Sequence, residues 1–226
     1  MATTARDLAA SIVELIPSGQ PGLFNPWRES CPQDSDTNGP SQRLERLAAH
    51  LDCQPRFILM GEAPGYQGCR YSGVAFTSER LLGEGAIPRI APTGRLSKRH
   101  IPFSEPSATI VWSTLYRLGM AEDTVLWNAL QMHPFRPGQI WSNRTPSRDE
   151  VAAGAPAMRM LREAFPHAKI VAVGRKAEGL LAAMGIPAFA TVRHPANGGA
   201  TDFATGLLEA SRGKGAGCSY PGPSPS

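Results

Sequence analysis

Short apolar runs alternate with helical patterns along most of this chain, and the alternation predicts its fold. Four runs have the length and composition of buried strands, at residues 56–60, 124–130, 169–173 and 188–192. Segments with apolar residues at helical spacing lie between them. Alternating strands and helices form a parallel sheet with right-handed crossovers and helices on both faces. The sequence therefore predicts an α/β fold, a three-layer αβα sandwich around a central four-stranded parallel sheet.

The first 55 residues are expected to pack on this sheet as a helix, a loop and a second helix. Pro17 and Gly19 stop an amphipathic helix. Residues 23–40 are rich in Pro, Ser, Asn and Asp and predict a loop, and a helical pattern begins at Ser41. We therefore expect one domain over residues 1–210.

Capping signals predict the later helices. Ser107 is expected to cap a helix that Gly119 closes, and Ser147 with Glu150 forms a capping box before the next. The intervening residues 83–106 predict a long irregular loop, and such loops are usually functional or mobile. Two further helices are expected at 175–184 and 201–210. Residues 211–226 are rich in Gly, Pro and Ser and predict a disordered tail.

Composition narrows the class of protein. A chain of 226 residues with 42% hydrophobic and 19% charged residues is typical of a globular domain. A net charge of +4 is compatible with a polyanionic partner and equally with none. The four cysteines lack CxxC spacing, and no apolar run reaches the length of a membrane span. The N-terminus lacks an apolar signal core. We expect a cytoplasmic protein with free thiols and no membrane association.

Four polar segments are expected at the carboxyl ends of the strands. The first, GEAPGYQG at Gly61–Gly68, directly follows a buried strand and contains the carboxylate of Glu62. The others are Asn128 with the HPFRP segment, the segment SNRTPSRDE and the segment RHPANGG. Parallel strands direct their carboxyl ends to one edge of a sheet, where ligands of open α/β folds bind. The sequence therefore predicts one shared site at this edge.

These motifs together resemble the uracil-DNA glycosylase superfamily, from Phe57 to about Phe203 and in the same order. The resemblance is closest to the bacterial iron–sulfur type. Gly61–Gly65 and Asn143–Pro146 match its GEAPG and NRTP motifs letter for letter. SGVAF matches the family's stretch that ends in an aromatic residue, and His194-Pro195 matches its closing HP motif. The resemblance implies that the protein hydrolyses the bond between uracil and deoxyribose in DNA, after flipping the nucleotide into a pocket.

The resemblance implies two residues that read the base. Phe76 would stack on the uracil ring; without the motif, ordinary core packing would be the favoured interpretation. Asn128 would donate to O4 and accept from N3–H of uracil, an arrangement that cytosine does not match. A satisfied strand end is the alternative for Asn128. Gly61, Ala63 and Tyr66 complete the expected uracil-binding set.

The resemblance also implies two catalytic residues. His194 would donate a hydrogen bond to uracil O2 as negative charge develops on the leaving base. Glu62 would position or activate water and favour the cationic sugar. Several branches place Asp or Asn at the next position, where this chain has Ala63. The alternatives are a plain turn histidine and a solvated or helix-capping glutamate.

Contacts to DNA are expected from a second set of residues. Ser78, Ser107, Arg144, Arg193 and Asn197 are the candidates, with helix N-termini as further phosphate sites. A basic run in the long loop could face DNA or be a solvated surface; its members are Arg95, Lys98, Arg99 and His100.

The chain departs from the iron–sulfur branch at the cluster ligands. Met132 and Gly154 stand at the two later ligand positions, and only Cys31 is available near the N-terminus. We therefore expect no cluster, no metal and no other cofactor. One branch binds uracil covalently through a histidine, and that position is Asn143 here, so covalent capture is not expected.

The base pocket departs from other members as well. Gly65 stands where they place a bulky aromatic that blocks the thymine methyl group, and Tyr66 is a possible substitute. The segment after His194 lacks an apolar wedge, which favours single-stranded or weakened sites where flipping costs least. The pocket motifs contain no lysine, so no lyase step is expected.

The leading hypothesis is a monomeric, monofunctional uracil-DNA glycosylase of base-excision repair, acting on single- or double-stranded DNA. Alternatives are excision of hypoxanthine or mismatched thymine, a non-catalytic module that binds damaged or single-stranded DNA, and a small-nucleotide hydrolase. The last is disfavoured because the sequence shows no cluster of metal-binding carboxylates.

Overall fold

A four-stranded parallel sheet lies at the centre of the computed structural model, which describes residues 4–213. The strand order is β3-β2-β5-β6, and every neighbouring pair is parallel. The strands are β2 (Phe57–Gly61), β3 (Thr124–Asn128), β5 (Lys169–Val173) and β6 (Ala190–Val192). The predicted sheet is thus confirmed. The ends of three strands differ from the prediction: β2 is shifted by one residue, β3 stops at Asn128 and β6 starts at Ala190.

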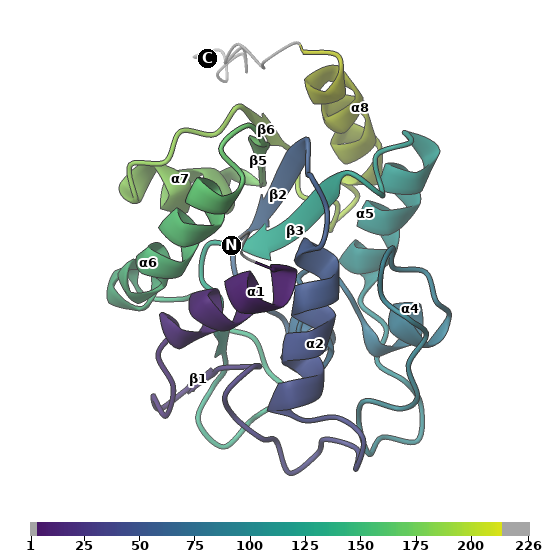
Figure 1. The fold of residues 1–226 in the computed structure, drawn as a ribbon, viewed down its shortest axis with the longest axis vertical. Helices are drawn as coiled ribbons and strands as arrows, with labels where there is room; N and C mark the ends of the chain where they lie inside the picture. Colours follow the sequence, from purple (N-terminus) through teal and green to yellow (C-terminus); the bar gives the residue numbers. More distant parts are fainter. Residues whose placement is uncertain (1–3, 214–226) are drawn as a thin grey trace, which may run out of the picture.

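Helices cover both faces of this sheet, which confirms the predicted three-layer αβα sandwich (Figure 1). Successive residues of a strand face opposite sides, so Leu59 packs in one apolar core and Ile58 in the other. The first core includes residues of α5 (Pro106–Arg117) and α8 (Ala200–Ser211). The second includes residues of α1 (Ala5–Glu14), α2 (Pro40–Leu51), α6 (Arg148–Ala164) and α7 (Arg175–Ala183).

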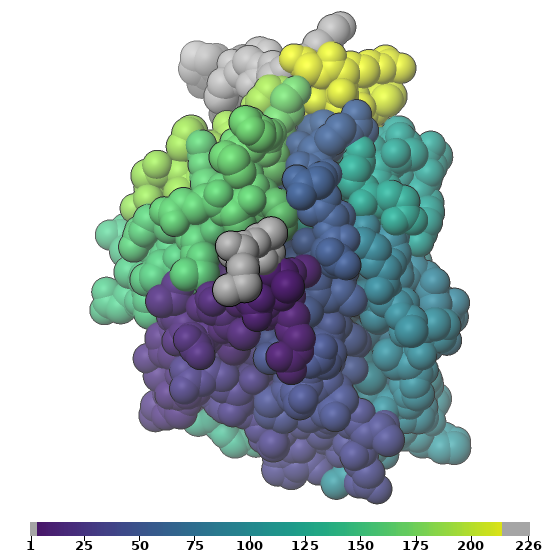
Figure 2. All heavy atoms as spheres, in the orientation of Figure 1, coloured from purple at the N-terminus to yellow at the C-terminus, as the bar shows by residue number. Residues whose placement is uncertain are grey.

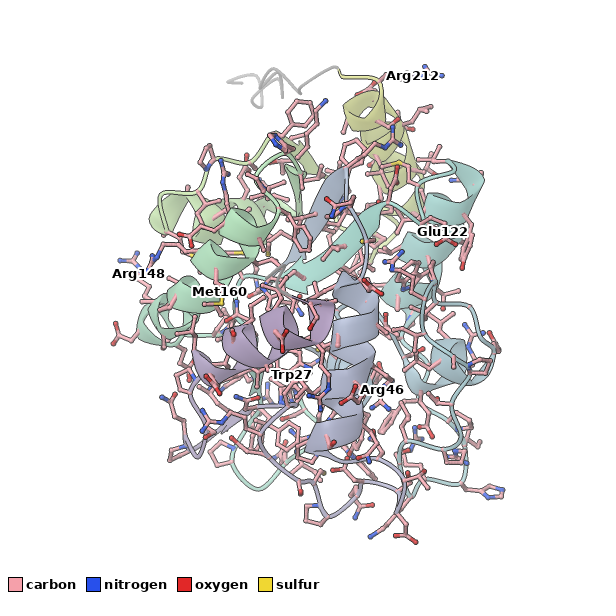
Figure 3. The ribbon with its side chains drawn as sticks, in the orientation of Figure 1. Trp27, Arg46, Glu122, Arg148, Met160 and Arg212 are labelled. Carbon is pink, nitrogen blue, oxygen red and sulfur yellow. The ribbon has the colours of Figure 1, made fainter. Side chains whose placement is uncertain are left out.

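The N-terminal segment packs on this second face and against the loop that follows β2. Trp27 stacks on Trp127 of β3 with ring centroids 5.8 Å apart, and its Nε1 donates to the Gly73 carbonyl at 3.0 Å. From α2, Arg46 Nε donates to the Ser72 carbonyl at 2.7 Å. Trp27 and Arg46 are labelled in Figure 3 beside α1 and α2. Figure 2 shows the purple N-terminal residues lying directly against green residues of the C-terminal half.

One short strand pairing in this region was not predicted. β1 (Leu23–Phe24) pairs antiparallel with β4 (His133–Pro134) inside segments that read as loops. Two-residue strands leave no periodicity in the sequence, so the pattern could not reveal them. The short helices α3 (Cys69–Ser72) and α4 (Glu79–Gly83) lie in the segment after β2.

Helix starts were predicted correctly at α6 and wrongly at α5. Ser147 Oγ accepts from the Glu150 amide at 3.2 Å, and the Ser147 amide donates to the Glu150 carboxylate at 2.7 Å, which is the expected capping box. Helix α5 instead begins at Pro106 after Glu105, because proline suits the first position of a helix. Ser107 lies inside the first turn and donates to Glu105 Oε1 at 3.0 Å.

Helix α8 extends to Ser211, one residue into the segment predicted as a tail. The rest of that expectation concerns residues 214–226, which lie outside the described residues. None of the described helices combines the length and the apolar character that crossing a membrane requires.

Candidate active site

A cavity of about 460 Å³ lies at the carboxyl ends of the four parallel strands. It is lined by residues that end or follow every strand of the sheet: Glu62–Gly65 after β2, Asn128 on β3, Val173–Lys176 at the end of β5, and Arg193, His194, Ala196 and Asn197 after β6. Phe76, Cys69 and Glu105 complete the lining. The structure therefore brings Glu62, Phe76, Asn128 and His194 together from four distant parts of the chain.

Gly61 allows the aromatic ring and the amide to approach the strand end. A Cβ at Gly61 would lie 2.5 Å from Asn128 Oδ1 and 2.8 Å from Phe76 Cζ. Phe76 itself has φ of 49°, a left-handed backbone conformation that is uncommon for a bulky residue. Trp112 Nε1 holds this conformation by donating to the Phe76 carbonyl at 2.9 Å. Gly61 is thus adjacent to the cavity, where it makes room for two lining side chains.

Asn128 presents its carboxamide to the cavity. The side chain is only 6% exposed, and within residues 4–213 no protein group hydrogen-bonds to the carboxamide. The backbone around it is fixed, since its carbonyl accepts from Gln131 Nε2 at 3.0 Å. Buried amides normally find partners. An amide that is held in place without one is suited to hydrogen-bond a ligand.

The tautomer of His194 follows from its backbone contact. The Ala196 amide donates to His194 Nδ1 at 3.2 Å, so this nitrogen accepts and Nε2 carries the proton of a neutral imidazole. Burial lowers the pKa of His194, which also favours the neutral ring. The ring centroid lies 6.4 Å from that of Phe76. His194 therefore offers an Nε2–H donor at the cavity, near the aromatic face.

Gly174 and Gly199 shape the backbone around His194. Gly174 has φ of 90°, and a Cβ there would lie 3.2 Å from the His194 Cβ. A Cβ at Gly199 would clash with the His194 carbonyl oxygen. The close approach of these two glycines holds the imidazole between the end of β5 and the turn after β6.

Glu62 forms an ion pair that the sequence did not reveal. Lys176 Nζ lies 3.3 Å from Glu62 Oε1 and 3.3 Å from Thr145 Oγ1. Lys176 lines the cavity, although it lies outside the motifs in which no lysine was found. The available signal was the position of GlyArgLys directly after a predicted strand. The segment SNRTPSRDE, which was assigned to that edge, is instead adjacent to the cavity through Thr145.

Glu105 is a second carboxylate of the cavity that sequence analysis missed. Its side chain lies against Gly68, where a Cβ would clash with Oε2. Burial raises the pKa of Glu105, and the hydrogen bond from Ser107 partly opposes this effect. A carboxylate at the start of α5 lies 43 residues from Glu62, and no pattern in the sequence connects the two.

Tyr66 was expected to bind uracil and to fill the space beside Gly65, but its ring points elsewhere. The Tyr66 ring packs edge-on against Phe103 with centroids 5.8 Å apart, and Tyr66 is not among the lining residues. A Cβ at Gly65 would lie in ordinary van der Waals contact with the Asn143 side chain, 3.7 Å from its Nδ2. Ala63 does line the cavity, as the uracil-binding set requires. Tyr66 therefore does not replace the aromatic that other members place at Gly65.

One of the predicted DNA contacts is contradicted by the structure, and a second is an arginine that is paired within the protein. Ser78 is fully buried, so its hydroxyl cannot reach a phosphate. Arg144 forms an ion pair with Glu150 at 2.5 Å and donates to the Gly22 carbonyl at 3.0 Å. Its guanidinium thus joins β1 to α6. The Ser78 hydroxyl is buried without a hydrogen-bond partner in the described part of the chain, whereas Arg144 makes local contacts that a sequence motif cannot show.

The other three candidates lie in or near the cavity. Arg193 and Asn197 line it and are exposed, and Asn197 has φ of 54° in the turn after His194. Ser107 is half-buried in the first turn of α5. These positions are compatible with contact to a phosphate next to a bound base.

The residues at the iron–sulfur positions do not fit such a cluster. Met132 is fully buried in the second apolar core, and Gly154 packs against Gln131. Cys31 Sγ lies 3.6 Å from the Tyr71 hydroxyl. Over residues 4–213, three or more His, Cys, Asp or Glu side chains are nowhere grouped to hold a metal ion. A thiolate set for the cluster is therefore missing from this part of the chain.

The αβα sandwich thus holds a carboxylate, an aromatic face, an amide and an imidazole in one cavity. A family model for the uracil DNA glycosylase superfamily matches residues 48–226. The chain belongs to this superfamily, as its motifs indicated, and membership supports a DNA glycosylase.

Comparison with individual proteins gives the fold. The crystal structure of wild-type SMUG2 from Pedobacter heparinus is similar with a TM-score of 0.65 and 15% identity. The similarity covers 93% of this chain and 98% of that one. No curated protein matches the chain.

Proposed function

We propose that this protein is a monofunctional uracil-DNA glycosylase that flips deoxyuridine out of DNA and hydrolyses its N-glycosidic bond, the first step of base-excision repair. The observation that carries the proposal is the meeting of Glu62, Phe76, Asn128 and His194 in one cavity of about 460 Å³. A pocket of this size accepts a pyrimidine nucleotide but not a base pair, so the nucleotide must leave the stack.

The base is held by its face and by its edge. Phe76 stacks on the ring, and its position against Gly61 fixes the plane of the base. The Asn128 carboxamide donates to O4 and accepts from N3–H. Cytosine presents the opposite pattern at these two atoms and leaves a buried amide unpaired.

Bond cleavage depends on the opposite charges that develop on base and sugar. The N1–C1′ bond breaks, and its electron pair goes to the base, where the His194 Nε2–H donates to O2. Glu62 lies at the same cavity and stabilises the cationic sugar while it orients water for attack on C1′. Lys176 orients the Glu62 carboxylate through their ion pair.

The lysine also defines a test of monofunctionality. A lyase would need the Lys176 amine to attack C1′, but Lys176 pairs with Glu62 and is exposed. We expect borohydride to trap no covalent complex between the wild-type protein and uracil-containing DNA. A trapped complex that disappears in Lys176→Ala would show that the enzyme is bifunctional.

A single-turnover assay with a uracil-containing oligonucleotide tests the main proposal. Alkali should cleave the strand at the uracil after incubation with the enzyme, also in the presence of EDTA. His194→Ala should slow uracil release by about 10²–10³-fold, the usual effect of losing one such donor. His167→Ala, a change at an exposed histidine, is the matched control. Undiminished activity of His194→Ala would refute the assigned role.

The absence of a bulky side chain at Gly65 gives one alternative a physical basis. Gly65 has no side chain that would exclude a methyl group at C5, and the Tyr66 ring packs against Phe103. Mismatched thymine is therefore the second candidate base, ahead of hypoxanthine. Rates on uracil, thymine and hypoxanthine opposite the same partner base decide between them. Salt-dependent binding without release of any base would identify a non-catalytic module instead.

The proposal includes a monomer that acts in the cytoplasm on uracil-containing DNA without a cofactor. The turn after His194 carries Ala196 and Asn197 and no apolar wedge. Single-stranded or weakened sites are therefore the preferred substrates. Equal rates on single-stranded and fully paired uracil would count against this preference.

A further inference from the structure

Three loops beside the cavity form a surface in which the exposed Trp141 and basic groups lie over the buried ring of Phe103. We propose that this surface, made by Tyr66, Arg99, Ile101, Phe103 and Trp141, binds an unpaired nucleotide next to the flipped base. We call it the stacking surface. The proposal deepens the proposed function, because it names the single-stranded form of DNA as the favoured substrate.

The aromatic rings form a continuous row away from the cavity. Tyr66 directly follows Gly65 of the cavity wall. Its ring contacts Phe103 edge-on at 5.8 Å, and Phe103 contacts Trp141 edge-on at 5.8 Å. The Tyr66 amide also donates to Asn143 Oδ1 at 3.1 Å. This hydrogen bond joins the loop after β2 to the loop that carries Trp141. Trp141 is therefore two ring contacts away from the residue that borders the base pocket.

The exposed end of this row is rigid. Trp141 is 42% exposed, yet its Nε1 donates to the Tyr71 hydroxyl at 2.8 Å. The Arg99 guanidinium lies 4.3 Å from the Phe103 ring centroid and 5.9 Å from that of Trp141. Ile101 beside them is 67% exposed. A large indole held in one orientation at the surface offers a preformed face on which a base can stack.

Charge complementarity indicates a polyanion as the occupant. Two of the three segments that build the surface, residues 85–104 and 129–148, contain no Asp or Glu. They carry Lys98, Arg99 and Arg136, and none of these forms an ion pair within the described residues. A basic groove with aromatic side chains is the usual arrangement for binding single strands without sequence preference.

The geometry favours a single strand over a duplex. A base in a duplex is stacked between its neighbours and cannot place its face on Trp141. The turn after His194 also supplies no apolar group to open a duplex. The stacking surface would instead hold a strand that is already open, so that the adjacent nucleotide enters the cavity.

Fluorescence anisotropy with a labelled, uracil-free oligonucleotide tests the proposal separately from catalysis. The single strand and its duplex are compared for wild type, Trp141→Ala, Trp141→Phe and Arg99→Ala. Trp141→Ala should bind the single strand about tenfold more weakly and change duplex affinity less than about threefold. Trp141→Phe should retain most of the affinity, because it keeps an aromatic face. Arg99→Ala should lower the salt dependence of binding.

Tyr116→Ala is the matched control. Tyr116 is 49% exposed in the last turn of α5, about 15 Å from the start of the helix near the cavity. It should leave both affinities unchanged. An unchanged affinity of Trp141→Ala for the single strand, or an equal loss for single strand and duplex, overturns the stacking surface.

These outcomes are distinct from failure of the proposed function. If wild type releases uracil and Trp141→Ala binds normally, the stacking surface is wrong and the glycosylase stands. If Trp141→Ala loses single-strand affinity and wild type releases no base, the surface stands and the glycosylase is wrong.

Discussion

The substitution Gly61→Ala tests whether the close packing at the end of β2 sets the geometry of the site. The added Cβ would lie 2.5 Å from Asn128 Oδ1, against about 3.4 Å for the shortest ordinary contact. It would lie 2.8 Å from Phe76 Cζ. Both side chains must therefore move by roughly 0.6–0.9 Å, or the strand must shift by as much.

A displacement of this size is large for a catalytic site. A misplacement of about 1 Å can reduce a rate by about 10²-fold, because the reacting groups leave their productive geometry. We expect single-turnover release of uracil by Gly61→Ala to slow by about 100-fold. Overpacking should also destabilise the fold by about 1–3 kcal/mol. For a domain of this size that lowers Tm by roughly 2–10 °C, so the variant stays folded at assay temperature.

The matched control is Gly179→Ala in α7. A Cβ at Gly179 has no neighbour within 4 Å, so the substitution adds a methyl group without a clash. Alanine in a helix is favoured over glycine by about 0.5–1 kcal/mol, and Tm should rise slightly while activity is unchanged. If Gly61→Ala releases uracil at a rate within about threefold of wild type, the positions of Asn128 and Phe76 do not control the reaction.

Three further predictions concern titration and charge. The pKa of His194 is lowered, so protonation of its ring should reduce the rate of uracil release only below pH 6.5. Imidazole ¹⁵N chemical shifts at pH 7 should show the neutral Nε2–H tautomer, and a charged ring at that pH contradicts this prediction. Arg193→Ala should weaken DNA binding and reduce the slope of log K against log[salt] by about 0.7–0.9 in magnitude. Arg144→Ala should lower Tm and leave that slope unchanged, because Arg144 is paired with Glu150. Burial raises the pKa of Glu105 above 4.5, so its ionisation lowers folded-state stability as pH rises through that raised value. Glu105→Gln should therefore raise Tm near pH 8 and not near pH 4, and an equal rise at both pH values excludes this explanation.

The sheet and the convergence of motifs were predictable because both depend on local patterns. Buried strands leave apolar runs, and a parallel topology brings the segments that follow them to one edge. Glu62, Asn128 and His194 lie at or after strand ends, so the sequence placed them correctly. Phe76 was placed by its motif alone, since its left-handed backbone has no signal in the pattern.

The contacts that the sequence missed are long-range pairings between side chains. Lys176 reaches Glu62 across 114 positions, and Arg144 turns to Glu150 and a distant carbonyl instead of DNA. The orientation of Tyr66 depends on Phe103, which belongs to another loop. Residue type and spacing give the groups available at a site. They do not give the partner that each group selects, because that choice depends on three-dimensional distance.

The strained backbone at Phe76 needs support, and the N-terminal segment supplies it. A non-glycine residue with positive φ costs on the order of 1–3 kcal/mol and persists only where surrounding contacts fix it. The segment leading to Phe76 is fixed by Trp27 at the Gly73 carbonyl and by Arg46 at the Ser72 carbonyl. The iron–sulfur branch holds the corresponding lobe with a cluster, whereas this chain uses buried hydrogen bonds and the Trp27–Trp127 stack. Loss of the Trp27 contact should therefore disturb the Phe76 ring, although Trp27 does not line the cavity.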